Sequence, residues 1–576
     1  MTDAPPPEAF RPRWGAAGWA LVLAAFAVGF YALPLKTIGP RADHLPGDAV
    51  DNRLNNFILE HGYRYLVGRE PSFWDAPMLY PAAGATRTSD AHIGMLPAYA
   101  TLRLCGLSPE GAFQGYFLIP FVLNFAAAAW GCRRLGFGPV AAAVGGYVFT
   151  FSLPVAAQLW HVQLFPRFLV PPALVFAWEF LHRPRAWRAW AVVGCVVGQT
   201  YLSVYIGYML GLTMAVGAIA AAVLGRRELP WRELVWPGWR GGVARAAAVG
   251  AGALALLPLL YNHARGGGRE GAPLALLRAL APRPRAWVSP PAPAATLPDL
   301  ADAVGLKTSR GVEQQLMPGL LTLAALPAGL AAGLWRGRPG GRAAVSAAAW
   351  TVVALALVTT RFEDAWLYEP LTRLPGVRGI RAVGRIVLVA LFPMGLVLGA
   401  CAEAAVAAAG RAGRTGAACA AVLVTGAVVA DHWLVSTTGP RADAWAGNRI
   451  SKDVVVRRQA AIVEAVRRHP APRLLYVFPP LRPADLFDVY LVQCAAMRAS
   501  QDAGIPCVNG WSGYLPDGWY VFPRYGPLFW WLKTTGVGPD ELAGLVIVGD
   551  PAPEGDAVYD AAMRATYPPQ PFPPVP

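Results

Sequence analysis

The sequence predicts a polytopic, all-α membrane protein that carries a small α/β domain at its C-terminal end. Of the 576 residues, 55% are hydrophobic and 15% are charged, whereas soluble domains carry about a quarter charged residues. The charges sum to +15 but stand in short clusters between long apolar stretches, a pattern typical of membrane orientation and not of nucleic-acid binding. The seven cysteines form no CxxC pair and no Cys/His cluster, so a zinc or iron–sulfur motif is not indicated. These observations exclude a soluble globular protein.

About eleven apolar windows of spanning length follow one another before residue 437. Because a hydrocarbon core of about 30 Å needs roughly 20 apolar residues per helix, each window is expected to cross the membrane. The apolar stretch 91–105 is short and carries Arg103. We expect a juxtamembrane or re-entrant helix there, whereas a span at this place would reverse the orientation of all later spans. The windows run approximately over 14–35, 110–131, 138–154, 160–181, 186–203, 204–224, 243–262, 317–335, 343–360, 386–409 and 415–436.

Short loops rich in arginine predict which ends of the spans face the cytoplasm. Every basic cluster follows an even-numbered span, which places the N-terminus inside and the segments 36–109, 263–316, 361–385 and 437–576 outside. The first span has an apolar core too long for a cleaved signal peptide, so it is expected to remain as an anchor. The clusters are Arg133 and Arg134; Arg183, Arg185 and Arg188; Arg226, Arg227, Arg232, Arg240 and Arg245; Arg336, Arg338 and Arg342; and Arg411 and Arg414.

After residue 436 the long apolar windows give way to short apolar runs. This change divides the chain into a membrane part, 1–436, and an outer domain, 437–576. Short apolar runs at 474–478 and 545–548 are typical of buried strands, and 484–503 is typical of a helix between them. About 140 residues suffice for a small α/β domain with a core of its own. Cys494 and Cys507 both lie in this part and form either a disulfide or a pair of free buried thiols, because spacing alone does not decide between the two.

The first outer loop, 36–109, opens with two carboxylates beside the membrane surface. Asp48 and Asp51 stand three residues apart, so they would share one helix face. The stretch 52–68 has apolar residues at helical spacing, which predicts an amphipathic helix lying in the membrane interface. In one interpretation Asp48 is the N-cap of this helix and Asp51 complements its dipole. In the other, one of the two is a rigidly held general base.

Further polar residues near the outer ends of the spans are candidate substrate ligands. Asp75 is expected in an ordered loop with two prolines. Its carboxylate either accepts hydrogen bonds from backbone amides or binds the substrate. Arg87 and His92 follow it in the chain and are further candidates. His161 and Gln163 begin the fourth span. A histidine there is either solvated or faces a cavity, and polar groups within spans are costly and therefore informative.

Two charged features on the outer side suggest phosphate binding. Glu313 stands at the mouth of the eighth span, shortly before Met317-Pro318-Gly319. Arg378, Arg381 and Arg385 precede the tenth span, and their i, i+3, i+7 spacing would place three guanidiniums on one side of a helix. Because guanidinium forks fit phosphate oxygens, these arginines are candidates for holding a lipid phosphate. Anchoring to anionic headgroups is the alternative.

This order of features resembles the GT-C superfamily of polytopic glycosyltransferases that use polyprenyl-phosphate sugars, especially uncharacterised bacterial members and the YfhO-like group. The resemblance covers about residues 14–436 and departs from the oligosaccharyltransferases, because a Trp-Trp-Asp-Tyr-Gly motif is missing and Trp530-Trp531-Leu532-Lys533 is no substitute. Transfer to protein asparagine is therefore disfavoured. The features that carry the resemblance are the anchor span, the acidic start of the first outer loop, Asp75-Ala76-Pro77 with Tyr80-Pro81, His161-Val162-Gln163, Glu313 with Met317-Pro318-Gly319, and the arginine segment.

The resemblance implies an inverting transferase of the bacterial inner membrane, which moves a sugar from a polyprenyl-phosphate donor to a lipid or glycan acceptor on the outer side. It implies Asp48, and second Asp51, as the general base. Some relatives bind a divalent metal ion near these acids, and His44 could add a ligand, but three residues without a fourth define no site. No cofactor is therefore assigned. The resemblance also implies that Arg378, Arg381 and Arg385 hold the donor phosphate and that His161 and Gln163 face the cavity.

Two other functions stay open, a lipid or solute transporter and a non-catalytic membrane scaffold that displays the outer domain. A transporter is expected to show internal repeats and polar groups at mid-membrane, whereas here the ionisable residues cluster at the outer ends of the spans. A scaffold would not need acids, histidine and arginines from separate loops to converge. Convergence of these side chains in three dimensions therefore discriminates between the functions. Membrane lipids, and no nucleic acid, are the expected partners.

Overall fold

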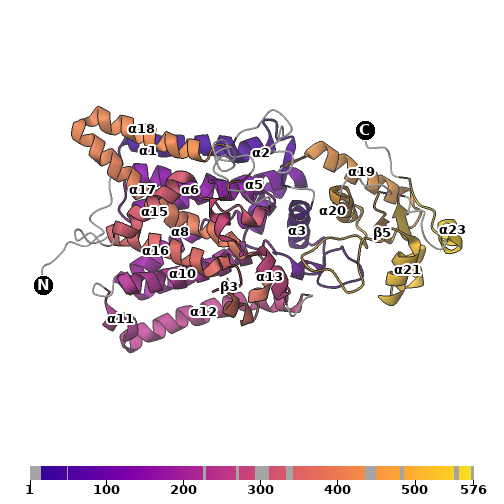
Figure 1. Cartoon of the computed structure of the whole chain (residues 1–576). Coiled ribbons are helices and arrows are strands. Elements are labelled where there is room, and N and C mark those ends of the chain that lie inside the picture. Colours follow the sequence, from indigo (N-terminus) through magenta and orange to yellow (C-terminus); the bar gives the residue numbers. More distant parts are fainter. Residues whose placement is uncertain are drawn as a thin grey trace.

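The chain folds as a bundle of long helices with an α/β layer at one end (Figure 1). The computed structural model describes residues 14–47, 50–224, 229–266, 271–291, 311–332, 341–434, 449–480, 486–549 and 557–571. The bundle helices are α1 (Ala16–Phe30), continued by η2 (Tyr31–Leu35) and α2 (Lys36–Ile38), then α5 (Pro109–Arg134), α6 (Pro139–Phe151), α7 (Leu153–Ala157), α8 (Val170–His182), α9 (Ala186–Leu202), α10 (Val204–Leu224), α11 (Trp231–Val235), α12 (Gly238–Arg265), α15 (Leu320–Ala332), α16 (Gly341–Thr359), α17 (Val387–Ala409) and α18 (Arg414–Asp431).

Helices occupy all of the apolar windows, and several have the dimensions of a membrane span. Among the described residues, seven helices are both long enough and apolar enough, and α15 and α16 are apolar but shorter. The fourth window differs from expectation, because α8 begins only at Val170 and has 13 residues. Residues 158–169 instead form an irregular segment with one short turn, η4 (Val162–Leu164). The prolines at 166 and 171 do not fit a helix interior, and this segment is where His161 and Gln163 lie.

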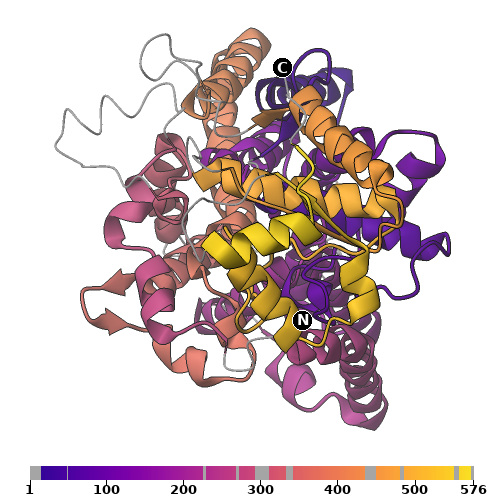
Figure 2. The ribbon, with the colours of Figure 1, turned by 90° about the vertical axis from the view of Figure 1, so that its right-hand side faces the viewer.

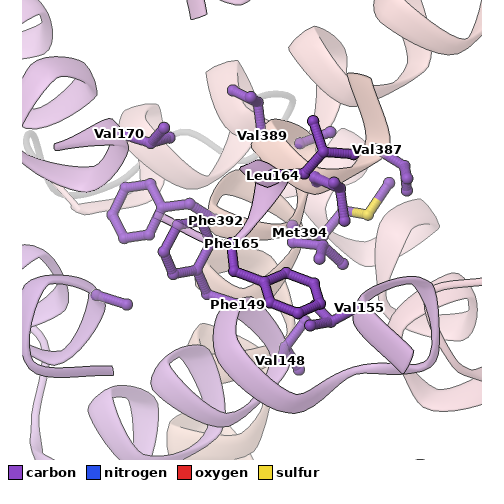
Figure 3. Close-up of a cluster of buried hydrophobic side chains, with 14 of the residues drawn as sticks. Val148, Phe149, Val155, Leu164, Phe165, Val170, Val387, Val389, Phe392 and Met394 are labelled. Carbon is purple, nitrogen blue, oxygen red and sulfur yellow. The ribbon is translucent and has the colours of Figure 1, made fainter. Parts of the chain in front are cut away.

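The centre of the bundle is the crossing of α6 and α17, which lets two backbones approach closely. A Cβ atom at Gly399 would lie 2.7 Å from the carbonyl oxygen of Ala141, and one at Gly395 would lie 2.9 Å from that of Gly145. Small residues four apart on both helices are the usual device for such contact between spans. Beside the crossing, Phe149, Phe165 and Phe392 pack with Val and Met side chains from α6, α17 and the 153–170 segment (Figure 3).

The first outer loop forms two helices that lie between the bundle and the α/β layer. They are α3 (Asp51–Leu66) and α4 (Leu96–Leu104). At about 1.5 Å per residue, the nine residues of α4 are too few to cross a membrane, as expected. The expectation that α3 lies in the membrane interface is wrong, because residues 52–62 are all buried. Leu54, Phe57 and Ile58 join the core of the α/β layer, while the polar face bonds to the bundle.

The α/β layer, residues 449–571, is built on a small parallel sheet that the first outer loop extends. The two strands that the sequence predicts, β5 (Leu474–Val477) and β6 (Leu545–Val548), pair in parallel, and single bridges add Cys507 and Gln570 at the two edges. The backbone of 77–80 bonds to that of 507–509 at 3.0–3.1 Å. The remaining elements of the layer are β4 (Arg449–Ser451), α19 (Lys452–Arg468), α20 (Leu486–Ala503), α21 (Tyr525–Thr534), α22 (Pro539–Ala543) and α23 (Ala557–Thr566).

Hydrogen bonds and ion pairs fix this layer over the end of the bundle (Figure 2). Strand β1 (His44–Pro46) pairs antiparallel with β4. The buried carboxylate of Glu60 on α3 accepts from Arg103 at 2.8 Å and from Arg64 at 3.3 Å, and Arg64 also bonds Asp502 of the layer at 2.9 Å. Cys494 and Cys507 are both free and buried, which decides against the disulfide.

Candidate functional site

Four charged or titratable side chains from separate segments meet where the bundle faces the layer. Asp51 begins α3, His161 lies before η4, Glu313 lies in the turn η6 (Val312–Gln314) and Arg385 lies in the turn η9 (Val383–Ile386). Arg385 donates from Nε to Glu313 Oε1 at 3.0 Å and from Nη2 to His161 Nε2 at 3.0 Å. Asp51 Oδ2 stands 3.6 Å from the same His161 nitrogen. We call these four residues the central cluster.

Burial differs within the central cluster, and only Asp51 is widely accessible. The side chains of His161 and Arg385 are each 11% exposed and that of Glu313 is 13% exposed, against 38% for Asp51. Burial holds the pKa of His161 well below its usual range, and the guanidiniums of Arg385 and Arg381 lower that pKa further. The imidazole is therefore neutral near pH 7. Because Nε2 accepts from Arg385, its proton sits on Nδ1, and Asp51 receives no hydrogen bond from this ring.

Two 3₁₀ turns with Arg381 between them, and not one helix, carry the arginine segment, so the expectation of three guanidiniums on one helix face is wrong. Turn η8 (Val377–Gly379) ends two residues before Arg381, and η9 begins two residues after it. Glycine at 384 lets the backbone approach the carbonyl oxygen of Glu313, since a Cβ there would lie 3.2 Å away. This approach brings Arg385 to Glu313. Arg378 lies elsewhere in the fold, where its backbone carbonyl accepts a hydrogen bond from the amide of Ala272 at 3.1 Å.

Arg381 is exposed and lies at the rim of the central cluster. Its backbone amide donates to the hydroxyl of Tyr205 at 3.0 Å, and the ring of Tyr205 lies 5.0 Å from the guanidinium of Arg385. Its charge lowers the pKa of His161 and opposes the rise that burial causes in the pKa of Tyr514. Among the described residues the Arg381 guanidinium has no carboxylate partner. It is therefore one of the charges of this segment that remain free to receive an anion.

A loop of the α/β layer, residues 509–514, closes one side of the site. The indole of Trp511 donates from Nε1 to Asp51 Oδ1 at 3.1 Å and packs on Tyr490 with ring centroids 4.5 Å apart. Ser512 bonds the hydroxyl groups of Thr88 and Ser89. The layer thus contributes directly to the environment of a site carboxylate.

Two asparagines on the polar face of α3 position the site, and the sequence analysis missed both. Asn52 donates to the carbonyl of Leu159 at 2.8 Å and accepts from the amide of Val162 at 3.1 Å, so it fixes the backbone on both sides of His161. Asn55 donates to Gln163 Oε1 at 2.8 Å. The available signal was three amides, Asn52, Asn55 and Asn56, on the polar face of an amphipathic helix, since buried amides require partners.

His92 belongs to the interior network behind the site and does not face a cavity. Its Nε2 lies 2.9 Å from Asn55 Oδ1 and its Nδ1 lies 2.9 Å from the hydroxyl of Tyr116. Because the amide oxygen can only accept, Nε2 carries the proton. Burial lowers the pKa of His92 to about 3. The network leaves Gln163 half-buried with its oxygen occupied, so its amide hydrogens are the groups that it can offer to a ligand.

Asp75 and Arg87 stabilise the loop around them and are not among the side chains that contact the central cluster. Asp75 accepts from the hydroxyl of Ser72 at 2.7 Å and from the amide of Gly84 at 2.6 Å, and Arg87 lies 3.9 Å away. Partial burial favours the neutral acid, but these bonds outweigh it, so the pKa of Asp75 lies below its ordinary value. This is the loop-carboxylate interpretation.

Asp48 lies outside the described residues, so its predicted role as N-cap or base is not seen. The N-cap of α3 is Val50, without a side-chain cap. Among the described residues there is no group of three or more metal-ligating side chains. Glu313 and His161 Nε2, which could otherwise coordinate a divalent ion beside Asp51, both accept hydrogen bonds from Arg385. The predicted ligand set of His44, Asp48 and Asp51 falls partly outside the described residues, so it stays a prediction, and no step is assigned to a metal ion.

Comparison with known proteins gives similarity of structure and not of sequence. No protein-family model matches the chain, and no curated protein matches it. The solved structures that are similar to it include an oligosaccharyltransferase and ArnT, each at 13% sequence identity.

Three of these structures illustrate the extent of the similarity. The apo oligosaccharyltransferase of Archaeoglobus fulgidus is 13% identical with a TM-score of 0.49, and the match covers 84% of this chain and 64% of that one. The enzyme AglB of that organism, in complex with an inhibitory peptide and a dolichol-phosphate, is 11% identical with a TM-score of 0.43, covering 86% and 64%. ArnT from Cupriavidus metallidurans is 13% identical with a TM-score of 0.35, covering 96% and 90%. The chain spans less than two thirds of the archaeal oligosaccharyltransferase.

Proposed function

We propose that this protein is a GT-C-type glycosyltransferase that moves a sugar from a polyprenyl-phosphate donor to a lipid or glycan acceptor. One observation carries the proposal. An accessible carboxylate, Asp51, and a guanidinium without a carboxylate partner among the described residues, Arg381, both lie near His161 of the His161–Arg385–Glu313 group, at one end of an apolar bundle. A base and an anion receiver are the two groups that this transfer requires.

The chemistry balances with these groups. The acceptor hydroxyl oxygen forms a bond to the anomeric carbon while the bond from that carbon to the phosphate oxygen breaks. The hydroxyl proton passes to a carboxylate, Asp51 or the neighbouring Asp48, and the departing phosphate takes the electron pair beside Arg381. Attack from the side opposite the phosphate inverts the anomeric configuration. The site supplies mainly position and charge, which suffices for a donor that already has a good leaving group.

The other side chains near the cluster would orient the reactants. Arg385 is already neutralised by Glu313, so it holds His161 in one tautomer and gives the wall of the site a fixed geometry. Gln163 would offer its amide hydrogens to the sugar. A scaffold needs none of these contacts, and a transporter would be expected to place ionisable groups along a path through the bundle.

We place this end of the bundle on the extracytoplasmic side of a bacterial inner membrane. The arginine-rich turns lie at the other end, where Arg134 and Arg188 share the carboxylate of Glu179 at 2.6 and 3.2 Å. Arginines concentrate on the cytoplasmic side of polytopic proteins. This orientation puts the N-terminus inside and the α/β layer outside.

The test compares Asp48→Asn and Asp51→Asn with the wild type in nanodiscs, using a polyprenyl-phosphate sugar and extracted envelope lipids as acceptors. We expect at least one of the two to lose product formation while remaining folded. Asp517→Asn, an exposed carboxylate of the layer, is the matched control and should keep full activity. Mass spectrometry of lipid-linked sugars and envelope glycans from cells with and without the gene identifies the product. Full activity in both variants would remove the proposed base.

A further inference from the structure

An open, arginine-lined depression lies beside the central cluster, on the same side of the bundle. Its volume is about 830 Å³. It is formed by α13 (Leu274–Leu280), the turn η5 (Pro284–Val288), η6 and the hairpin of β2 (Arg361–Phe362) and β3 (Ala365–Trp366). In Figure 2 this hairpin stands at the edge of the molecule, beside the α/β layer and not beneath it. The lining residues are Ala279, Arg283, Pro284, Arg285, Gln314, Arg361, Phe362 and Glu363.

The charge of the depression is positive and only partly compensated. Among the described residues, three guanidiniums and the carboxylate of Glu363 line it, and the exposed carboxylate of Asp364 lies 4.0 Å from Arg361. Arg361 is engaged by the carbonyl oxygens of Glu363 at 2.8 Å and Arg278 at 3.0 Å. The side chains of Arg283 and Arg285 have no hydrogen bond or ion pair with any residue that the structure describes. Two guanidiniums are therefore available to an anion.

The backbone that carries these arginines is rigidly held. Gln314 accepts from the amide of Arg283 at 3.0 Å and donates to the carbonyl of Ala281 at 2.9 Å. On the other side, the amide of Arg361 donates to the carbonyl of Pro282 at 2.9 Å. Hence the segment that carries Arg283 and Arg285 is fixed before any ligand arrives, which reduces the entropic cost of binding.

We propose that this depression is a second anion site, which binds a phosphate group. Guanidinium forks match the oxygens of phosphate in geometry and charge, and the carboxylates of Glu363 and Asp364 leave Arg283 and Arg285 without an ion pair among the described residues. The phosphate is carried by a lipid headgroup or by a free phosphate compound. Gln314 lines the depression and directly follows Glu313 of the central cluster in the chain, so the two sites share the turn η6. The inference does not depend on glycosyl transfer.

The experiment measures binding and not activity. The full chain is purified and reconstituted with phosphatidylcholine alone or with added phosphatidylglycerol, and native mass spectrometry counts the retained phosphatidylglycerol. In parallel, thermal unfolding in detergent is followed as inorganic phosphate is added. We expect the Arg283→Gln/Arg285→Gln variant to bind phosphatidylglycerol or inorganic phosphate at least about fivefold more weakly than the wild type. This is the change that loss of one partly solvated ion pair produces. The Arg283→Lys/Arg285→Lys variant should keep intermediate binding.

Two further variants sharpen the result. Arg373→Gln removes an exposed arginine of the same side that does not line the depression, and it should bind like the wild type. Glu363→Gln removes the opposing carboxylate and should bind more tightly. Retention of phosphatidylglycerol without competition by phosphate identifies a lipid headgroup, and stabilisation by phosphate identifies a soluble compound. Equal binding by the wild type and the Arg283→Gln/Arg285→Gln variant, or no binding by either, overturns the proposal.

Discussion

The indole nitrogen of Trp511 lies 3.1 Å from Oδ1 of Asp51, although 460 residues separate them in the chain. The tryptophan belongs to the α/β layer and the aspartate opens α3, so the layer fixes one oxygen of an accessible site carboxylate. The other oxygen faces His161 at 3.6 Å. A domain that appears in the sequence to be an appendage therefore helps to form the site.

Replacing Trp511 by phenylalanine should lower the transfer rate about tenfold without unfolding the protein. The substitution keeps a ring on Tyr490 but removes the N–H donor, and hydrogen bonds to charged groups contribute about 1.5–3 kcal/mol, less at a partly exposed site. Activity assays in nanodiscs and thermal unfolding of the same preparations measure the two effects. Trp530→Phe is the control, since Trp530 is 59% exposed on the same layer. Unchanged turnover in Trp511→Phe would show that the bond does not position Asp51.

The sequence predicts the helices of the bundle and the strands of the sheet because burial and membrane thickness determine the length and hydrophobicity of runs of consecutive residues. Apolar windows correspond to helices, and the runs at 474–478 and 545–548 are β5 and β6. The window at 160–181 fails because hydropathy does not distinguish an apolar helix from an apolar irregular segment that is buried inside protein. The amphipathic pattern of α3 fails for a similar reason, since a layer of protein covers the face that was expected to meet lipid.

The site is harder to predict because its contacts join distant segments. Acids, His161 and arginines were all identified, but nothing in their spacing shows that Arg385 pairs with Glu313, 72 residues away. Helical spacing was the wrong rule for 378–385, where glycines at 379 and 384 accompany 3₁₀ turns. Asn52 was missed because its importance lies in two backbone groups of another segment.

Gly47→Ala should disrupt the site far more than Gly68→Ala. Both glycines have left-handed backbones, with φ of 76° and 75°, so alanine costs about 1–2 kcal/mol of strain at either position. Only at Gly47 does the new Cβ meet another group, 1.2 Å from Nδ2 of Asn52, whereas nothing lies within 4 Å at Gly68. Displacing Asn52 breaks its bonds to Leu159 and Val162. We expect Gly47→Ala to lose transfer activity and Gly68→Ala to retain it; similar losses in both would assign the effect to backbone strain alone.

Glu313→Gln should destabilise the protein more than the double substitution Glu313→Gln/Arg385→Gln. The single change leaves a buried guanidinium without its carboxylate, at a cost of about 3 kcal/mol, and the second change removes that charge. Unfolding of the wild type, both single variants and the double variant gives the coupling free energy. Additive losses would mean that the pair contributes no coupling.

Acidification should destabilise the fold between pH 6.5 and about 4, and His61 should account for part of this. Burial lowers the pKa of His61 from its ordinary 6.5 to about 4; bonds to Ser72 and Phe73 and the charge of Asp75 oppose the shift, while Arg64 adds to it. The unfolded chain therefore takes up a proton at this residue over a range in which the folded chain does not. Stability is full above pH 6.5 and falls by up to about 1.4 kcal/mol per pH unit for this group.

Other buried groups, His161 among them, act in the same pH range, so the test isolates His61 by substitution. His92 adds to the loss, whereas burial raises the pKa of Asp90 to about 6, which favours the folded state as the pH falls. His61→Gln keeps a donor for the carbonyl of Ser72, which His61 Nε2 contacts at 2.9 Å, but it does not titrate. The apparent Tm of His61→Gln should therefore decline less between pH 7 and pH 5 than that of the wild type or of His469→Gln. Parallel declines in all three proteins would show that protonation of His61 does not limit stability in acid.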